Sequence, residues 1–206
     1  MKRTDASAPR LRGRPRGFDR EAALERAMEV FWRQGYEGTS ITDLTRAMRI
    51  NPPSLYAAFG DKERLYLEAL ERYQQGRRDE LGPLLDQAPT ARQAIERLLH
   101  EAARLYAQPD APRGCMLMLS CTACAETSLQ SQLAKRRADV KKALKARIER
   151  GLAASELPRG TDVDALADFY TTLLKGMALQ ARDGASRRSL VAAAEAAMRA
   201  WPARRR

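Results

Sequence analysis

Apolar side chains recur every three or four positions along most of the chain, and polar side chains occupy the positions between them. In the first such stretch, the apolar positions follow the i, i+3, i+4, i+7 spacing of one helical face: Leu24, Ala27, Met28 and Phe31. The pattern begins after Asp19 and reaches Gly35, a residue type that commonly ends helices. It therefore predicts a helix over residues 20–34.

Two short amphipathic segments follow the first helix. Ser40 and Asp43 have the spacing of a capping box, which predicts a helix over residues 41–48. Asn51 can cap a further helix over residues 52–59, because proline is tolerated in a first helical turn. Two short helices joined by a tight turn and flanked by longer helices are typical of a helix-turn-helix.

The rest of the chain is also expected to be helical. A fourth helix is predicted over about residues 62–78, and the Gly82-Pro83 pair is expected to interrupt the pattern. The apolar stretch that starts at Cys115 fits a buried strand or a buried helix, and its helical neighbours favour a helix. Further helices are predicted around residues 90–106, 129–152, 162–182 and 186–201. No strand or internal repeat is predicted, so the fold class is all-α.

The charge of the chain indicates a polyanionic partner. Its 206 residues include 37 Lys and Arg against 26 Asp and Glu, which gives a net charge of +11. Such an excess is typical of proteins that bind nucleic acid. Residues 1–16 hold six of the basic residues and residues 135–150 hold eight. The second cluster is equally consistent with a solubilising surface.

Composition limits the protein class and its compartment. Hydrophobic residues make up 44% and charged residues 31% of the chain, as in globular proteins. The sequence lacks an apolar run long enough to span a membrane, and no apolar segment of a secretory signal follows the basic N-terminus. Three cysteines, an odd number, fit a reduced compartment. We therefore expect a cytoplasmic protein with no membrane partner.

The second short helix would leave small and polar side chains outside the core: Asn51, Pro53, Ser54, Tyr56 and Ala57. Such a surface fits a DNA major groove, which is about 12 Å wide. Asn51 and Ser54 can bond base edges or phosphates, and the Tyr56 hydroxyl can reach a phosphate. Lys62 adds a positive charge beside a helix N-terminus. Double-stranded DNA is the predicted partner.

Residues 18–73 resemble the DNA-binding head of the tetracycline-repressor (TetR) family. The resemblance lies in the run Phe31…Gly35-Tyr36…Thr39-Ser40, the Ile41-x-x-Leu44 pair, the Ser54-Leu55-Tyr56…Phe59 segment and Asp61-Lys62-Glu63-x-Leu65. It implies a homodimeric transcriptional regulator with an all-helical fold. By position, the family's DNA contacts fall on these residues: Ser40, Thr42, Asn51, Pro53, Ser54, Tyr56, Ala57 and Lys62.

One position departs from the family pattern. Arg49 stands in the turn where family members usually have glycine. If the turn requires a positive φ, arginine costs roughly 1 kcal/mol there. Either the turn is built differently, or the arginine is tolerated because it gains a phosphate contact.

The basic arm before the head suggests a second DNA contact. Residues 12–17 read Arg-Gly-Arg-Pro-Arg-Gly, which resembles the core of an AT-hook. Glycine and proline keep such a segment thin and extended, while Arg12, Arg14 and Arg16 would enter a narrow A·T minor groove.

The resemblance divides the chain into three expected parts. Residues 1–18 are expected to be a disordered basic arm. Residues 19–80 are expected to form the three-helix DNA-binding head, with the helix-turn-helix at residues 40–59. Residues 81–206 are expected to form a helical bundle for ligand binding and dimerisation, in which the last two helices pair between protomers.

The three cysteines fall within ten residues, at Cys115, Cys121 and Cys124. A closed zinc site would need further ligands, and the chain has one histidine, so neither a metal nor a cofactor is expected. Cys115 follows Arg113-Gly114 at a predicted helix N-terminus, where its thiol pKa would be lowered, which makes it the candidate sensor. Buried packing is the alternative for all three cysteines.

Several apolar residues of the bundle could line a ligand pocket or equally form core: Tyr106, Met118, Phe169, Tyr170, Leu173 and Met177. These features favour a dimeric repressor that a small molecule or a thiol-reactive signal releases from a palindromic operator. The alternative is an architectural protein that binds DNA without sequence choice. An enzyme with a cysteine nucleophile is disfavoured, because a nearby base is needed and His100 is the single histidine.

Overall fold

The computed structural model describes residues 17–120 and 127–202, and all regular structure in these ranges is helical. The helices are α1 (Arg20–Gln34), α2 (Ile41–Met48), α3 (Pro52–Phe59), α4 (Lys62–Asp86), α5 (Ala91–Tyr106), α6 (Thr127–Ala153), α7 (Val163–Arg182) and α8 (Arg187–Met198). The predicted all-α fold class is confirmed.

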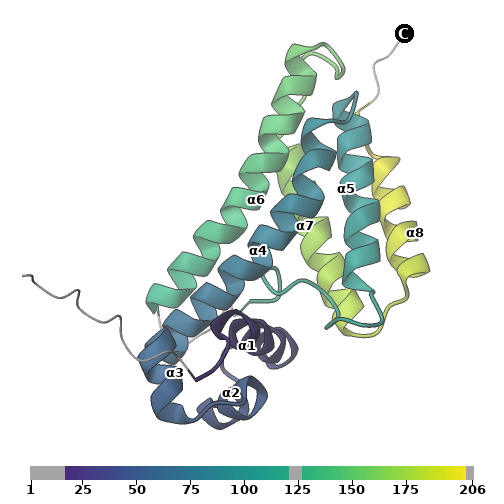
Figure 1. Ribbon diagram of the computed structural model, residues 1–206. Helices are drawn as coiled ribbons and strands as arrows, with labels where there is room; N and C mark the ends of the chain where they lie inside the picture. Colours follow the sequence, from purple (N-terminus) through teal and green to yellow (C-terminus); the bar gives the residue numbers. More distant parts are fainter. Residues whose placement is uncertain (1–16, 121–126, 203–206) are drawn as a thin grey trace, which may run out of the picture.

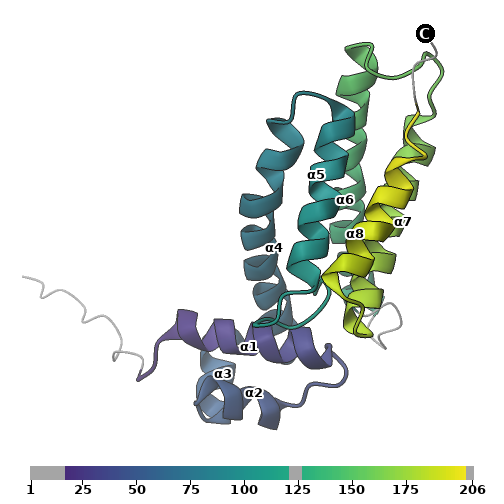
Figure 2. The same ribbon diagram turned by 90° about the vertical axis from the view of Figure 1, so that its right-hand side faces the viewer.

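The first three helices form a small head at one end of the molecule. Helix α1 crosses below the bundle, and α2 and α3 lie on its far side (Figure 2). Ser40 and Asp43 form the predicted capping box, and Asn51 caps α3 through a bond from the Ser54 amide. Phe31, Leu44 and Leu55 are buried in the core of the head.

The remaining helices form the bundle. Helix α4 runs from the head into the bundle beside α6, so it belongs to both parts (Figure 1). Helix α5 packs against α4 and α8, and α7 packs against α6 and α8. The head and the bundle are therefore joined by α4, which runs through both, and by α1, which packs against the lower end of the bundle.

Helix α4 is longer than the sequence predicts. It continues through Gly82 and Pro83 to Asp86 instead of ending near residue 78. Pro83 lies in the last turn of the helix. Because proline has no amide hydrogen, the backbone carbonyl of the exposed Asp79 is the one group that loses its helical hydrogen bond. Leu81 and Leu85 pack against the core and hold this last turn in place.

The helix predicted from Cys115 onward is absent from residues 115–120, which form tight turns instead. The Leu119 amide donates to the Cys115 carbonyl at 2.9 Å, a single helical turn that does not continue. Gly114 has φ +83°, and a Cβ there would lie 2.7 Å from the Ala178 carbonyl oxygen of α7. The apolar residues of this loop are buried by its contact with the bundle. Cys121 and Cys124 lie outside the described residues.

Candidate nucleic-acid interface and buried cavity

Helix α3 presents the surface that the sequence predicts for a recognition helix. It buries Leu55 and Phe59 and exposes Asn51, Pro53 and Ala57. Tyr56 is 51% exposed, one of three large hydrophobic side chains on the described surface with such exposure. The amide of Ser54 donates to Asn51 Oδ1 at 2.9 Å, which leaves the Asn51 side-chain NH₂ available to a ligand.

The other predicted contact residues surround this helix. Thr42 and Ser40 are exposed at the start of α2, and the Ser40 hydroxyl donates to Asp43 at 2.5 Å. The Ser40 hydroxyl is therefore already engaged in capping. Lys62, at the start of α4, has its ammonium 4.4 Å from the ring centroid of Tyr36. This contact with a buried ring positions the lysine charge beside α3.

The turn between α2 and α3 has, at Arg49, the positive φ that favours glycine. Arg49 has φ 58° and ψ 44°, the left-handed conformation. Its amide donates to the Arg46 and Thr45 carbonyls, so it closes α2 as a C-cap. Its side chain is exposed. Of the two alternatives for Arg49, a differently built turn is therefore wrong.

Arg12, Arg14 and Arg16 of the predicted arm lie outside the described residues. The first residues that the structure describes, Gly17 and Phe18, line a shallow recess on the head. The recess is shared with residues of the α2–α3 turn and of α3: Arg49, Ile50, Asn51, Ser54, Ala57 and Ala58. The segment that leads from the arm therefore joins the head beside the recognition helix.

The basic cluster of residues 135–150 is largely engaged within the protein. Lys145 of α6 bonds Asp164 of α7 at 2.8 Å, and Lys141 of α6 pairs with Asp168 of α7 at 2.7 Å. Both lysines therefore join α6 to α7. Arg136 bonds Glu71 of α4, and buried Arg147 donates to the Ala88 carbonyl at 3.2 Å. Most of this charge therefore ties helices together.

A cavity of about 260 Å³ lies between α4, α5, α6, α7 and the loop of residues 115–120. Of the six predicted pocket residues, Tyr106 and Met118 line it. Phe169, Tyr170, Leu173 and Met177 do not, and Leu174 is the residue of α7 that reaches it. Phe169 is 44% exposed on the outer face of α7, and Tyr170 is buried against Trp201 with a centroid distance of 5.7 Å.

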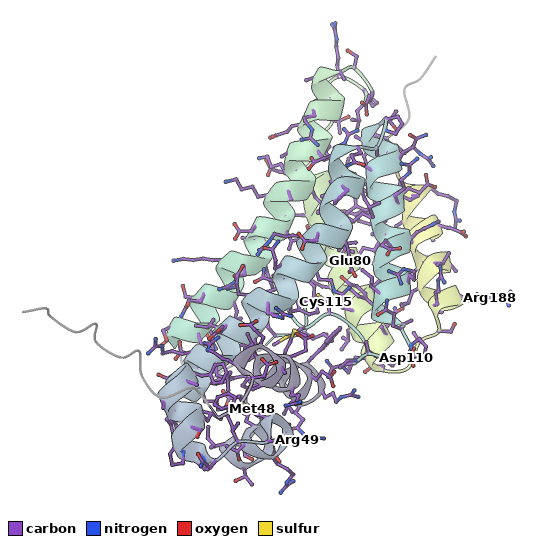
Figure 3. The ribbon with its side chains drawn as sticks, in the orientation of Figure 1. Met48, Arg49, Glu80, Asp110, Cys115 and Arg188 are labelled. Atoms are coloured by element: carbon purple, nitrogen blue, oxygen red, sulfur yellow. The ribbon has the colours of Figure 1, made fainter. Side chains whose placement is uncertain are left out.

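Cys115 lies on the wall of this cavity, near the junction of head and bundle (Figure 3). It is a free thiol, 7% exposed. No helix begins at Cys115, so the expected action of a helix N-terminus on its thiol is wrong. Its polar neighbours are Tyr73 of α4 and Tyr106 of α5. Burial, together with the neighbouring Cys115 sulfur, raises the pKa of both tyrosine hydroxyls well above the usual value.

Two arginines, Arg113 and Arg182, connect the Cys115 loop to the head through contacts that the sequence pattern did not predict. Arg182 of α7 donates to the Trp32 and Arg33 carbonyls at the end of α1, at 2.7 and 3.0 Å. It also donates to the Arg113 carbonyl at 3.2 Å. Arg113 in turn donates to the Ala181 carbonyl at 2.7 Å and to that of Ala185. Contacts between residues 69 or 150 positions apart leave no periodic signal in a sequence.

Two family models match this chain. Residues 23–69 match the bacterial regulatory proteins of the tetR family, and residues 89–200 match the tetracyclin repressor-like C-terminal domain. The chain belongs to the TetR family. It is accordingly a transcriptional regulator and not an enzyme.

Named TetR-family relatives share most of its length. The HTH-type transcriptional repressor ComR of Escherichia coli (strain K12) is 34% identical over 194 residues, covering 93% of this chain and 92% of ComR. The repressor BdcR of the same strain is 31% identical and covers 90% of each chain. A cysteine mutant of the TetR family regulator CifR, solved with a 26-base-pair operator DNA, is 43% identical with a TM-score of 0.89. That match covers 92% of this chain and all of the CifR chain.

Residues 17–120 and 127–202 of this TetR-family protein hold no group of three or more His, Cys, Asp or Glu side chains that could bind a metal ion. Within the same ranges, no helix is long and apolar enough to cross a bilayer.

Proposed function

We propose that this TetR-family regulator is a homodimeric, cytoplasmic repressor that binds a palindromic operator and releases it in response to a small molecule or a thiol-reactive signal. The observation that carries the proposal is the exposed surface of α3, held by a capped turn. The CifR relative was solved with operator DNA, and ComR and BdcR are repressors by name. These relatives support a DNA operator as the partner.

The proposed DNA contacts are the exposed side chains around α3. Asn51, Ser54 and Ala57 would face base edges, and the Tyr56 hydroxyl and the Lys62 ammonium would bond phosphates. Ser40, Thr42 and Pro53 would border the same groove. We also propose that Arg12, Arg14 and Arg16 enter the adjacent minor groove, because Gly17 joins the head beside α3.

The proposed dimer uses α7 and α8. Phe169 and Leu179 of α7 are 44% and 53% exposed, and Gly176 between them is also exposed. On α8, Ala192, Ala196 and Ala200 beyond its end follow helical spacing on an exposed face. Large exposed apolar side chains next to small ones are typical of a surface that a partner covers. A second copy of the chain is the proposed partner.

The proposed signal is received in the cavity beside Cys115 and reaches the head through two routes. One route is α4, which lines the cavity with Tyr73 and holds Lys62 at its other end. The other is the Arg113–Arg182 contact, which joins the Cys115 loop to the end of α1. We propose residues 19–80 as the DNA-binding unit and residues 81–206 as the sensing and dimerisation unit. Ligand or thiol modification must favour one of two arrangements of the heads to cause release.

The test is a selection of bound sequences from a random DNA pool at about 0.15 M salt, a concentration at which nonspecific phosphate binding is weakened. We expect a single inverted repeat from the reduced protein and its loss after treatment with diamide. The Cys115→Ser variant is expected to recover the same repeat with and without diamide. Release of Cys115→Ser by diamide would contradict the sensor role of this thiol.

Single-residue variants then separate specific from nonspecific binding to the selected repeat. Tyr56→Phe and Lys62→Ala are each expected to weaken binding by roughly tenfold, since each removes one phosphate contact worth about 1–2 kcal/mol. Lys142→Ala is the matched control, because Lys142 is an exposed lysine of α6 in the basic cluster. Equal losses for Lys62→Ala and Lys142→Ala, with only A·T-rich fragments recovered, would favour the architectural alternative.

A further inference from the structure

The inner end of the cavity collects hydrogen-bond donors. Tyr73 is 5% exposed, and its hydroxyl has no hydrogen-bond partner of normal geometry among the described residues. Tyr106 and Arg77 line the same end, where the Cys115 thiol is the neighbour of both tyrosines. Tyrosine hydroxyls are protonated at neutral pH, and burial raises the pKa of both further, so this end offers hydrogen-bond donors. A buried donor without a partner is costly, which favours a ligand that brings an acceptor.

Basic side chains outnumber acidic ones among the residues that line the cavity. Arg77, Arg78 and Arg136 line the cavity, against the single carboxylate of the exposed Asp139. Arg77 pairs with Glu80, and Arg78 and Arg136 pair with Glu71. Neither of these glutamates lines the cavity, and both are about half exposed. Water therefore screens the glutamates more than it screens the buried side of Arg77.

The remaining wall of the cavity is apolar. It is formed mainly by leucines from four helices and the loop: Leu81, Leu85, Leu98, Leu117, Leu144 and Leu174. Its volume of about 260 Å³ lies below the roughly 300–1,000 Å³ of sites for drug-sized ligands. The cavity therefore suits a small molecule with an apolar body.

We infer that the effector is a small monocarboxylate, with its apolar body among the leucines and its carboxylate bonded by Tyr73, Tyr106 and Arg77. This inference rests on the proposed function and names the ligand class of its effector site. A carboxylate supplies the acceptors that the donors lack, and a charge-assisted bond from arginine is stronger than a neutral one.

Arg77 also gives the ligand a direct route to the head. Its guanidinium lies 5.0 Å from the ring centroid of Tyr73 and 5.6 Å from that of Trp32 in α1. A carboxylate that draws Arg77 inward would change its contact with Trp32 and its pairing with Glu80. Arg77 thus acts as the residue that both selects the anion and reports it to α1.

The test is calorimetric titration of the full chain, without DNA, with two isosteric pairs of probes. These are hexanoate against hexanamide, and phenylacetate against phenylacetamide. We expect at least one carboxylate to bind about tenfold or more tightly than its amide and to change the fluorescence of Trp32. Failure of both carboxylates to bind, or equal affinity for acid and amide, would overturn the inference.

Variants identify the groups that hold the carboxylate. Tyr73→Phe and Arg77→Lys are expected to lower carboxylate affinity about tenfold and to change amide affinity little. Arg92→Met is the matched control, because Arg92 is an exposed arginine of α5 that pairs only with Glu96 of its own helix among the described residues. Thermal unfolding of each variant shows that it is folded. An unchanged carboxylate affinity in both Tyr73→Phe and Arg77→Lys would overturn the assignment.

The two levels of the proposal fail differently. A chain that selects an inverted repeat but binds no carboxylate keeps the proposed function and loses this inference. A chain that binds hexanoate but selects no repeat loses the proposed repressor function, and the cavity remains a carboxylate site.

Discussion

Arg49 adopts a backbone conformation that is unfavourable for any residue other than glycine. A left-handed conformation costs a non-glycine residue roughly 1–2 kcal/mol, and Arg49 adopts it at φ 58° to close α2. Its exposed side chain borders the same recess as Asn51 and Ser54 of the recognition surface. We propose that the arginine is kept at this position because its guanidinium bonds a DNA phosphate.

Replacing this arginine separates the two effects. Arg49→Gly is expected to raise the free energy of unfolding by about 1 kcal/mol, because glycine adopts positive φ freely. The same variant is expected to bind the selected operator more weakly. Urea unfolding and fluorescence anisotropy measure the two quantities. Arg46→Gly, inside α2, is the control and should lose about 1 kcal/mol of stability. Unchanged operator affinity in Arg49→Gly would contradict the phosphate contact.

At the scale of elements, α1 and α7 are joined through one side chain. Carbonyl groups at the end of a helix carry partial negative charge and have no partner within the helix. Arg182 supplies donors to two such carbonyls of α1, at Trp32 and Arg33, and to the loop carbonyl of Arg113. The position of α1 under the bundle is therefore fixed to the helix that we propose for dimerisation.

The Arg182→Met variant tests this connection. It is expected to lower the free energy of unfolding by about 2 kcal/mol, because hydrogen bonds from a charged donor are lost and carbonyls remain partly buried. Chemical denaturation measures the change. The control is Arg188→Met, since Arg188 is exposed at the start of α8 and forms no ion pair within residues 17–120 and 127–202 (Figure 3). Equal stability of the two variants would show that Arg182 does not hold α1.

At the scale of the whole molecule, the proposed palindromic operator requires two heads that reach successive major grooves. A palindromic site places its half-sites about 34–36 Å apart, so a monomer of this size cannot contact both with one head. Helices α7 and α8, which carry the exposed apolar residues Phe169 and Leu179 on α7, lie in the bundle, away from α2 and α3 (Figures 1 and 2). Pairing through these two helices would leave both recognition helices free for DNA.

A charge placed on the exposed side of α7 is expected to prevent dimerisation. Phe169→Glu should sediment as a monomer at micromolar concentration, because burying an unpaired carboxylate costs several kcal/mol. Tyr56→Glu is the matched control: Tyr56 is 51% exposed against 44% for Phe169, and it lies on the head. It should remain a dimer. Analytical ultracentrifugation distinguishes the two, and a dimeric Phe169→Glu would place the interface elsewhere.

The sequence by itself determined the features that depend on neighbours along the chain. Caps at Ser40 and Asn51, glycine stops and apolar spacing act within a few residues, so the helix-turn-helix and its exposed surface were predicted from them. The family resemblance added the expected DNA contacts, which stay predictions for each residue. Arg49 was recognised as unusual, but only its backbone angles decided between the two explanations.

Only the tertiary structure decided the features that depend on distant contacts. Hydrophobicity marked residues 115–120 as buried, but packing against α7 made them a turn, because an apolar run fits a buried strand, helix or loop alike. The same limit misplaced the end of α4, and it gave no means to tell that only Tyr106 and Met118 of the six candidate pocket residues line the cavity beside Cys115. Periodicity identifies the buried face of a helix, while the cavity, its donors and the Arg182 contact depend on what each face meets.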